Sequence, residues 1–188
     1  MIQFFKHTSI ASVFFLLIFT VATHFNFFIV APHVAVNEDD GLLSIFLLKY
    51  IKQLSETWLF MLYFSILILQ SIRLNIAMNS LKMFQVDNFT IALSYVIITA
   101  MLPQWNSITP AFLANILVIW IFVKLCALYN HPSPKTLLFN TGLISGLSIM
   151  AYHPTAVLIL VVSFALAVVR PFKFAEWLML IIGITLPY

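Results

Sequence analysis

Charged side chains are scarce in this sequence: Asp, Glu, Lys and Arg together make up 8% of its 188 residues. A water-soluble domain needs roughly a quarter charged residues to cover its surface. Hydrophobic residues instead make up 63% of the chain, and its mean hydropathy is +1.08. The shortage of charge excludes an ordinary soluble domain and predicts an integral membrane protein.

Other features are scarce or missing as well, and each absence removes a class of function. Cys126 is the single cysteine, so the chain cannot form an internal disulfide. The five histidines lack the paired spacing of a metal site, and no glycine-rich nucleotide-binding motif is present. The net charge is +3, but the basic residues stand scattered at the ends of apolar runs, which suits membrane orientation better than nucleic-acid binding. We expect no metal, no cofactor and no nucleic-acid partner.

The apolar residues form runs that are separated by short polar connections. A helix that crosses a bilayer takes about 20 apolar residues, so the chain has room for about seven. We expect helices at 8–30, 56–72, 88–102, 110–129, 136–151, 155–169 and 175–188. The expected fold is all-α: a polytopic transmembrane helical bundle of about seven helices, the last of which is either partial or cut short by the end of the given sequence.

The segment 42–54 differs from these runs. It is too short to cross a bilayer, and Ser44, Lys49 and Lys52 interrupt its apolar residues. Such a pattern is typical of a helix that lies on the membrane surface. We expect one interfacial amphipathic helix directly after the first membrane helix.

The membrane helices account for nearly the whole chain. We therefore expect residues 1–188 to form a single transmembrane domain. The last run, 175–188, is short for a full crossing. This shortness favours the interpretation that the sequence is the N-terminal part of a longer protein.

The basic residues orient this arrangement, because cytoplasmic connections carry an excess of Lys and Arg. With a cytoplasmic N-terminus, the outer connections hold only Lys49 and Lys52. The inner connections hold the others: Lys6, Arg73, Lys82, Lys124, Lys135, Arg170 and Lys173. The distribution predicts a multi-pass protein of the cytoplasmic membrane with its N-terminus in the cytoplasm.

Three outer connections carry the residues best suited to chemistry. These are Glu38, Asp39 and Asp40 after the first helix, Gln104 and Trp105 in the second connection, and Tyr152 and His153 in the third. Carboxylates and amides hydrogen-bond sugar hydroxyls, and an imidazole can contact a lipid-linked phosphate. A carboxylate can also act as general base on an acceptor hydroxyl. The outer face is therefore the candidate site, with Glu38, Gln104, Trp105, Tyr152 and His153 as candidate substrate-binding residues.

An ordinary explanation competes with this site. A loop from which basic residues are excluded is acidic without any chemistry, and aromatic residues commonly anchor at membrane interfaces. Two further features favour helix packing over chemistry. His24 and Asn26 are expected to form interhelical hydrogen bonds, and Gly142 with Gly146 forms a small-xxx-small pattern that lets another helix approach closely.

The order of these features resembles the membrane scaffold of the GT-C class of lipid-dependent glycosyltransferases. The resemblance is strongest over 94–171, where SYVIITAMLPQW and MAYHPTAVLIL place polar outer tips beside apolar helices. It implies an outward-facing site that transfers a sugar from a polyprenyl-phosphate donor. It also implies a catalytic acid at Asp39 or Asp40, just after the first helix, and matches His153 to a position that contacts the donor phosphate. The outer segment departs from that class, because it is short and has one surface helix.

The same stretch, with the closing RPFKFAEWLMLIIGITLPY, is also similar to a family of uncharacterised bacterial polytopic membrane proteins. This similarity implies the bacterial inner membrane as the location. The alternative to an enzyme is a non-catalytic membrane subunit or scaffold that packs against partner membrane proteins through Gly142 and Gly146. Membrane lipids are expected partners in both cases, and a polyprenyl-phosphate-linked sugar in the first. A transporter is less favoured, because the charged residues lie at helix ends rather than deep in the membrane.

Overall fold

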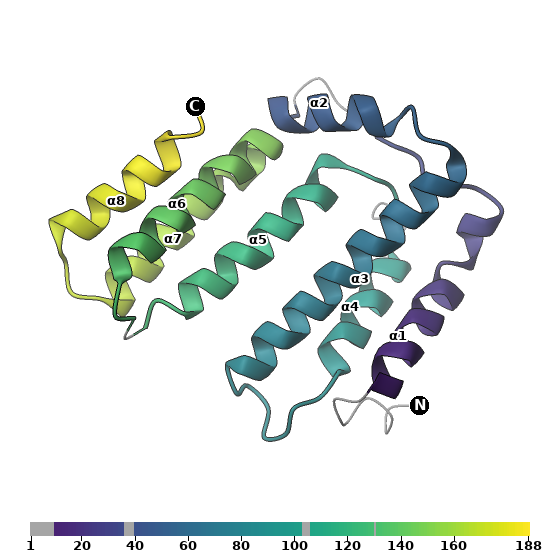
Figure 1. Ribbon diagram of the computed structural model, residues 1–188, viewed down its shortest axis with the longest axis horizontal. Coiled ribbons are helices and arrows are strands. Elements are labelled where there is room, and N and C mark those ends of the chain that lie inside the picture. Colours follow the sequence, from purple (N-terminus) through teal and green to yellow (C-terminus); the bar gives the residue numbers. More distant parts are fainter. Residues whose placement is uncertain (1–9, 36–39, 103–105, 130) are drawn as a thin grey trace. The chain divides into compact units, whose positions relative to one another are not determined.

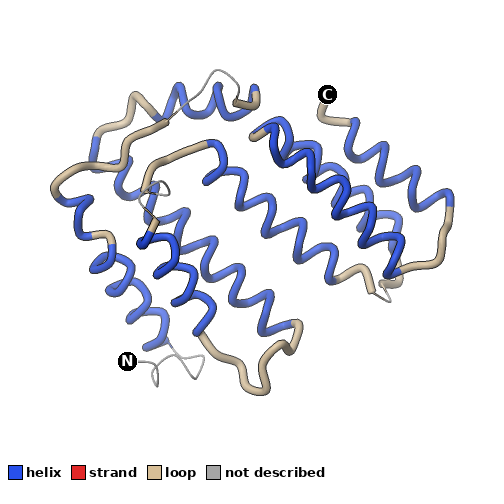
Figure 2. Tube along the Cα trace, turned by 180° about the vertical axis from the view of Figure 1, so that it is seen from behind, coloured by secondary structure: helices blue, strands red, loops and turns tan. Residues whose placement is uncertain are grey.

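The structure is a computed structural model, and it describes residues 10–35, 40–102, 106–129 and 131–188. Within these ranges the regular elements are helices, apart from one isolated β-bridge (Figures 1 and 2). The all-α prediction is confirmed. The backbone divides into two compact units: unit 1 is Met1–Ala35 with Tyr50–Thr109, and unit 2 is Val36–Lys49 with Pro110–Tyr188. The single transmembrane domain over 1–188 stays a prediction.

Unit 1 is built around three helices that contact one another: α1 (Ile10–Thr23), α3 (Glu56–Ser80) and α4 (Thr90–Met101). The 3-10 turn η2 (Phe25–Phe28) follows α1. Leu16, Ala92 and Val96 are fully buried in the core between α1 and α4. A parallel β-bridge between Val34 and Ile108 joins the segments that follow η2 and α4. The apolar runs of the sequence thus become the core-forming faces of this unit.

Helix α3 is longer than the sequence predicts. Polar residues favour a connection that begins at Arg73, but α3 continues through Arg73, Asn75 and Asn79 and ends at Ser80, before Lys82. The amides of Asn75 and Asn79 both donate hydrogen bonds to the Asn88 carbonyl oxygen, at 2.9 and 2.8 Å. Asn88 Oδ1 in turn accepts the N–H of Thr90, the first residue of α4, at 3.1 Å. The two asparagines are therefore connectors between helices rather than loop residues.

The first predicted helix, 8–30, is a single α-helix only over part of that range. Helix α1 ends at Thr23, and the tighter 3-10 turn η2 continues the apolar stretch to Phe28. The Thr20 hydroxyl donates to the Leu16 carbonyl oxygen at 2.7 Å, and such side-chain bonds compete with the regular backbone ladder near a helix end. Short 3-10 segments are common at such ends.

Unit 2 is organised around α6. Its elements are α2 (Leu42–Ile51, whose last two residues fall in unit 1), α5 (Pro110–Cys126), α6 (Pro134–Ala151), η4 (His153–Val157), α7 (Leu158–Val169) and α8 (Phe174–Thr185). Helix α6 contacts α5, α8 and η4. Leu138 and Ile144 of α6 pack in a core with Val162 and Leu166 of α7 and Leu180 of α8. The helix that the sequence marks with small residues is thus the central one.

Helices α6 and α8 approach until their backbones touch. A Cβ atom added to Gly142 would meet the Leu180 carbonyl oxygen and lie 3.1 Å from the Gly183 Cα. The contact is mutual, because a Cβ on Gly183 would meet the Phe139 carbonyl oxygen. Gly146 faces α8 in the same way one turn further on. The close helix approach predicted at Gly142 and Gly146 is confirmed, and the approaching helix belongs to this chain.

A largely buried ion pair connects the end of α7 to the start of α8. Arg170 Nε lies 3.2 Å from Glu176 Oε2, and the two side chains are 16% and 3% exposed. The N–H direction is not that of a hydrogen bond, so the contact is an ion pair only. Arg170 Nη1 also donates to the carbonyl oxygens of Leu128 and His131, each at 3.5 Å. Arg170 therefore joins the ends of α5 and α7 to the first turn of α8.

Helix α2 occupies the place of the predicted surface helix. It begins after Gly41, whose carbonyl oxygen accepts the Ile45 N–H at 3.0 Å. Ser44 is buried on the same side of α2 as Leu48, one turn away. Lys49 is exposed, as a surface helix requires.

The lengths of the helices bear on the predicted membrane crossings. Among the described residues, α3 is the one helix that is long and apolar enough to cross a membrane by itself. The other apolar helices that meet the composition test have 10 to 17 residues. The polytopic arrangement therefore stays a prediction.

Candidate functional site

The predicted outer-face residues fall into two groups. Glu38, Asp39, Gln104 and Trp105 lie outside the described residues. Asp40, Tyr152 and His153 are described, and all three belong to unit 2. The candidate site is therefore built here from Asp40 and the turn that contains Tyr152 and His153.

Asp40 is buried, with 6% of its surface exposed. Its position is fixed by Gly41, the residue that follows it. A Cβ atom added to Gly41 would meet the Met150 carbonyl oxygen, and it would lie 2.8 Å from the carbonyl carbon of Ala151. Only glycine permits so close an approach, so this contact brings the chain at Asp40 against the last turn of α6.

The turn after α6 is held by hydrogen bonds to Tyr152. Its N–H donates to the Ser148 carbonyl oxygen at 2.8 Å, which closes the helix. Its carbonyl oxygen accepts both the N–H and the hydroxyl of Thr155, at 3.0 and 2.7 Å. His153 opens the 3-10 turn η4 and is exposed, while Tyr152 is half-buried. The imidazole is thus accessible on a fixed piece of backbone.

These contacts place Asp40 at the same end of unit 2 as Tyr152 and His153. We call this region the Asp40 end and define it by Asp40, Gly41, Ala151, Tyr152 and His153. The C-terminal end of α6 carries partial negative charge, whereas the N-terminal end of α2, two residues after Asp40, carries partial positive charge, which favours a carboxylate. Asp40 is therefore a buried carboxylate between the end of α6 and the start of α2.

Sequence reasoning missed Ser44 at this end. It follows Asp40 by four residues, and it is fully buried. Its Oγ has no hydrogen-bond partner among the described residues. A buried hydroxyl without a partner costs roughly 1–3 kcal/mol. The spacing from Asp40 was visible in the sequence, but the burial was not.

The described residues offer no metal site. They contain no group of three or more His, Cys, Asp or Glu side chains near enough to hold one ion. The chemistry available at the Asp40 end is therefore that of a carboxylate, an imidazole, a phenol and a hydroxyl. These groups can accept a proton from a hydroxyl or hydrogen-bond a phosphate.

His24 and Asn26 do not form the predicted interhelical hydrogen bonds. His24 Nδ1 lies 3.0 Å from the Thr20 carbonyl oxygen of its own helix. The His24 ring contacts α3 through aromatic packing instead, with ring centroids 5.7 Å from Tyr63 and 5.8 Å from Phe64. Asn26 is exposed. The prediction was wrong because the bulky rings of α3 fill the space where a polar partner was expected.

Comparison with known proteins finds no family model, no curated protein and no solved structure that matches this chain. The family resemblance of the sequence therefore rests on its pattern of helices and polar tips. A function can also be argued from the geometry of the Asp40 end.

Proposed function

We propose that this chain is a polytopic membrane protein. Helix α6 has 18 residues, which at 1.5 Å per residue gives about 27 Å. The turn η4 and helix α7 together, His153–Val169, give about 28 Å. Helix α1 with η2 gives about 29 Å. These lengths approach the hydrocarbon thickness of about 30 Å.

Exposed apolar side chains support membrane insertion. On α7, Leu160, Phe164 and Val168 follow one another at a spacing of four residues and are 71%, 72% and 68% exposed. Soluble monomers rarely expose apolar patches of this kind without a partner. Lipid chains would cover this face, and we place the protein in the bacterial inner membrane with its N-terminus in the cytoplasm.

Within that membrane protein, we propose that the Asp40 end transfers a sugar from a polyprenyl-phosphate donor to an acceptor hydroxyl. One observation supports this most: the backbone contact of Gly41 with Met150 and Ala151, which brings the chain beside buried Asp40 against the end of α6 that precedes exposed His153. The resemblance of the sequence to the GT-C class supports the same assignment. The contact at Gly41 and the resemblance both point to an acidic residue that follows the first predicted membrane helix.

The proposed step uses each group for a definite purpose. The Asp40 carboxylate accepts the proton of the acceptor hydroxyl. The acceptor oxygen then forms a bond to the anomeric carbon of the sugar, and the bond from that carbon to the polyprenyl-phosphate oxygen breaks. The bond electrons leave on the phosphate, which His153 contacts through a charge-assisted hydrogen bond. Asp39 stays an alternative base, because it lies outside the described residues.

The test is a transfer assay in membrane vesicles with a set of radiolabelled polyprenyl-phosphate hexoses. Asp40→Asn keeps the size of the side chain but removes the base, so the rate should fall by about 10²- to 10⁴-fold. His153→Gln should raise the KM for the donor more than it lowers kcat. The double variant Asp39→Asn/Asp40→Asn covers the alternative base.

Asp87→Asn is the matched control, because Asp87 is an exposed carboxylate in the connection between α3 and α4. It should transfer sugar at the wild-type rate. Full transfer by the Asp39→Asn/Asp40→Asn variant would contradict the proposal, and so would a wild-type protein that transfers none of the hexoses.

The alternative function, a non-catalytic scaffold for partner membrane proteins, relied on Gly142 and Gly146. Both glycines contact α8 of the same chain. A partner would therefore need another surface, and we favour the enzyme.

A further inference from the structure

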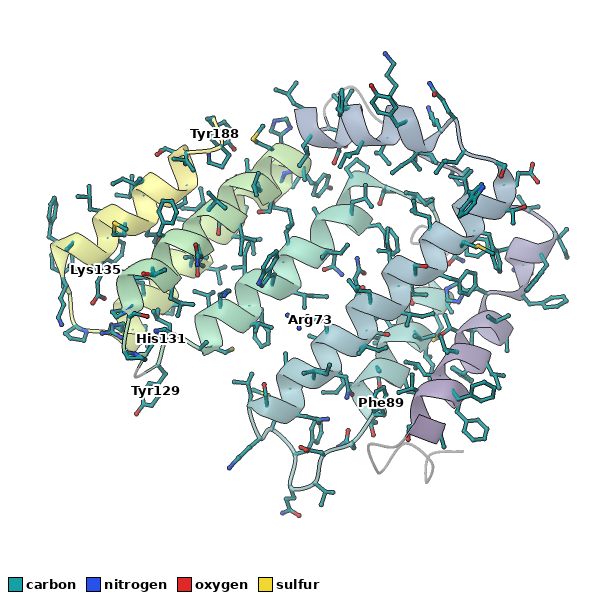
Figure 3. The ribbon with its side chains drawn as sticks, in the orientation of Figure 1. Arg73, Phe89, Tyr129, His131, Lys135 and Tyr188 are labelled. Carbon is teal, nitrogen blue, oxygen red and sulfur yellow. The ribbon has the colours of Figure 1, made fainter. Side chains whose placement is uncertain are left out.

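Basic residues gather at the end of unit 2 that is opposite to the Asp40 end along α6. Lys124 lies in the last turn of α5, and Lys135 in the first turn of α6. Lys173 immediately precedes α8. We call this region the lysine end and define it by Lys124, Lys135 and Lys173. Its helix termini belong to one compact unit, and Figure 3 labels Lys135 beside Tyr129 and His131, away from Tyr188 at the far end of α8.

Arg170 holds the lysine end together without contributing its own charge. Its side chain bonds the carbonyl oxygens of Leu128 and His131, before α6. Its charge is balanced by Glu176, at 3.2 Å. Glu176 is the acidic residue that α8 contributes to this region, and it is buried. The three lysines are therefore left as net positive charge on a fixed framework.

Two of the lysines, Lys135 and Lys173, stand where the helix dipole does not favour a positive charge. The N-terminus of a helix is its positive end, and a cation there is unfavourable. Lys135 and Lys173 both occupy such positions, and both are exposed. The described residues give no ion pair for either of them. Their positive charge is therefore available to an external anion.

Aromatic side chains stand beside the lysines. Tyr129, Phe172 and Phe174 are 79%, 75% and 71% exposed. Exposed aromatic rings next to Lys are typical of the depth at which a membrane protein meets lipid headgroups. An anion at this depth is a headgroup phosphate, since the rings can insert among the acyl chains while the ammonium groups remain at the surface.

We propose that the lysine end binds the headgroups of anionic phospholipids and selects them over zwitterionic ones. The inference rests on the membrane insertion proposed above, but not on sugar transfer. Lys124 is half-buried near the end of α5, where its long side chain can reach the headgroup level. The surface thus offers three ammonium groups to one face of the bilayer.

The test uses the purified full-length chain in mild detergent, titrated with phosphatidylglycerol and, separately, with phosphatidylcholine. The wild type should bind phosphatidylglycerol more tightly. Replacing Lys124, Lys135 and Lys173 by Gln should lower that affinity on the order of 100-fold, because each Lys near an anionic surface contributes about fivefold. The affinity for phosphatidylcholine should not change.

A charge-matched control distinguishes binding at the lysine end from attraction that depends only on the net charge of the protein. Lys49, Lys52 and Lys82 are exposed and lie outside the lysine end, so their triple Gln variant loses the same charge and should keep its preference for phosphatidylglycerol. Equal losses in the two triple variants, or equal wild-type affinity for both lipids, would overturn the inference. Resistance of the wild type to alkaline extraction is measured in parallel, since failure there overturns the membrane proposal instead.

Discussion

The two units hold their helices together with different residues, although both are rich in apolar side chains. In unit 1, Asn75 and Asn79 bond the backbone before α4, and the Tyr95 hydroxyl donates to Gln70 Oε1 at 2.5 Å. In unit 2, glycines bring α6 and α8 into backbone contact, as at Gly142. Apolar contacts alone do not distinguish one helix pair from another, so hydrogen bonds or close shape must do so. The chain uses both: hydrogen bonds of polar side chains in unit 1 and close packing at glycines in unit 2.

The largest expected effect concerns the ion pair that supplements the glycine packing of unit 2. Glu176→Gln leaves the largely buried Arg170 without its countercharge, which should cost about 3–5 kcal/mol of stability. Thermal unfolding in detergent measures the loss. Glu56→Gln is the control, since Glu56 is exposed, and an equal loss in both variants would contradict the role of the pair.

The glycine contact itself should be next in size. Gly142→Leu forces side-chain atoms into the Leu180 backbone, and such overpacking should cost about 3 kcal/mol. Ala167→Leu, at an exposed position of α7, should leave the unfolding temperature unchanged. If Gly142→Leu were equally harmless, α6 and α8 would not need backbone contact.

Unit 1 should respond to the loss of a polar group instead. Asn75→Ala removes the bond to the Asn88 carbonyl and leaves the Ala92 N–H without the acceptor it has at 3.3 Å. The expected cost is about 2 kcal/mol. Asn140→Ala, at a half-buried position of α6, is a control in unit 2 and should cost less.

The smallest effect is expected for Tyr95→Phe. The variant keeps the ring but removes the hydroxyl that bonds Gln70, so the stability should fall by about 1 kcal/mol. A loss as large as that of Gly142→Leu would remove the contrast between the two units.

The sequence predicted the helices well because prolines and polar clusters bound its apolar runs. Pro110 and Pro134 begin α5 and α6, where the missing N–H has no cost. The extent of α3 could not be predicted, since the partner of Asn75 lies 13 positions further along the chain, at Asn88. In the sequence alone, a polar helix residue whose partner is distant looks the same as a polar residue in a loop.

The sequence indicates which polar residues are candidates for the site, but it does not indicate which of them lie close together. Asp40 and His153 stand out as polar residues between apolar runs, yet nothing in the sequence indicates that Gly41 contacts α6. The lysines of the lysine end are a second case in which the sequence does not reveal the spatial arrangement. Their number predicts a side of the membrane, whereas their gathering depends on how Arg170 connects three helices.

The central claim is that the Asp40 end and the lysine end lie on opposite sides of a membrane. Single cysteines at Ala156 in η4 and at Ser133 before α6, both exposed positions, test it in a Cys126→Ser background with a membrane-impermeant maleimide on intact cells. The account predicts that the cysteine at position 156 reacts at once and that the one at 133 reacts only after permeabilisation. Labelling of both, or of position 133 alone, would contradict it.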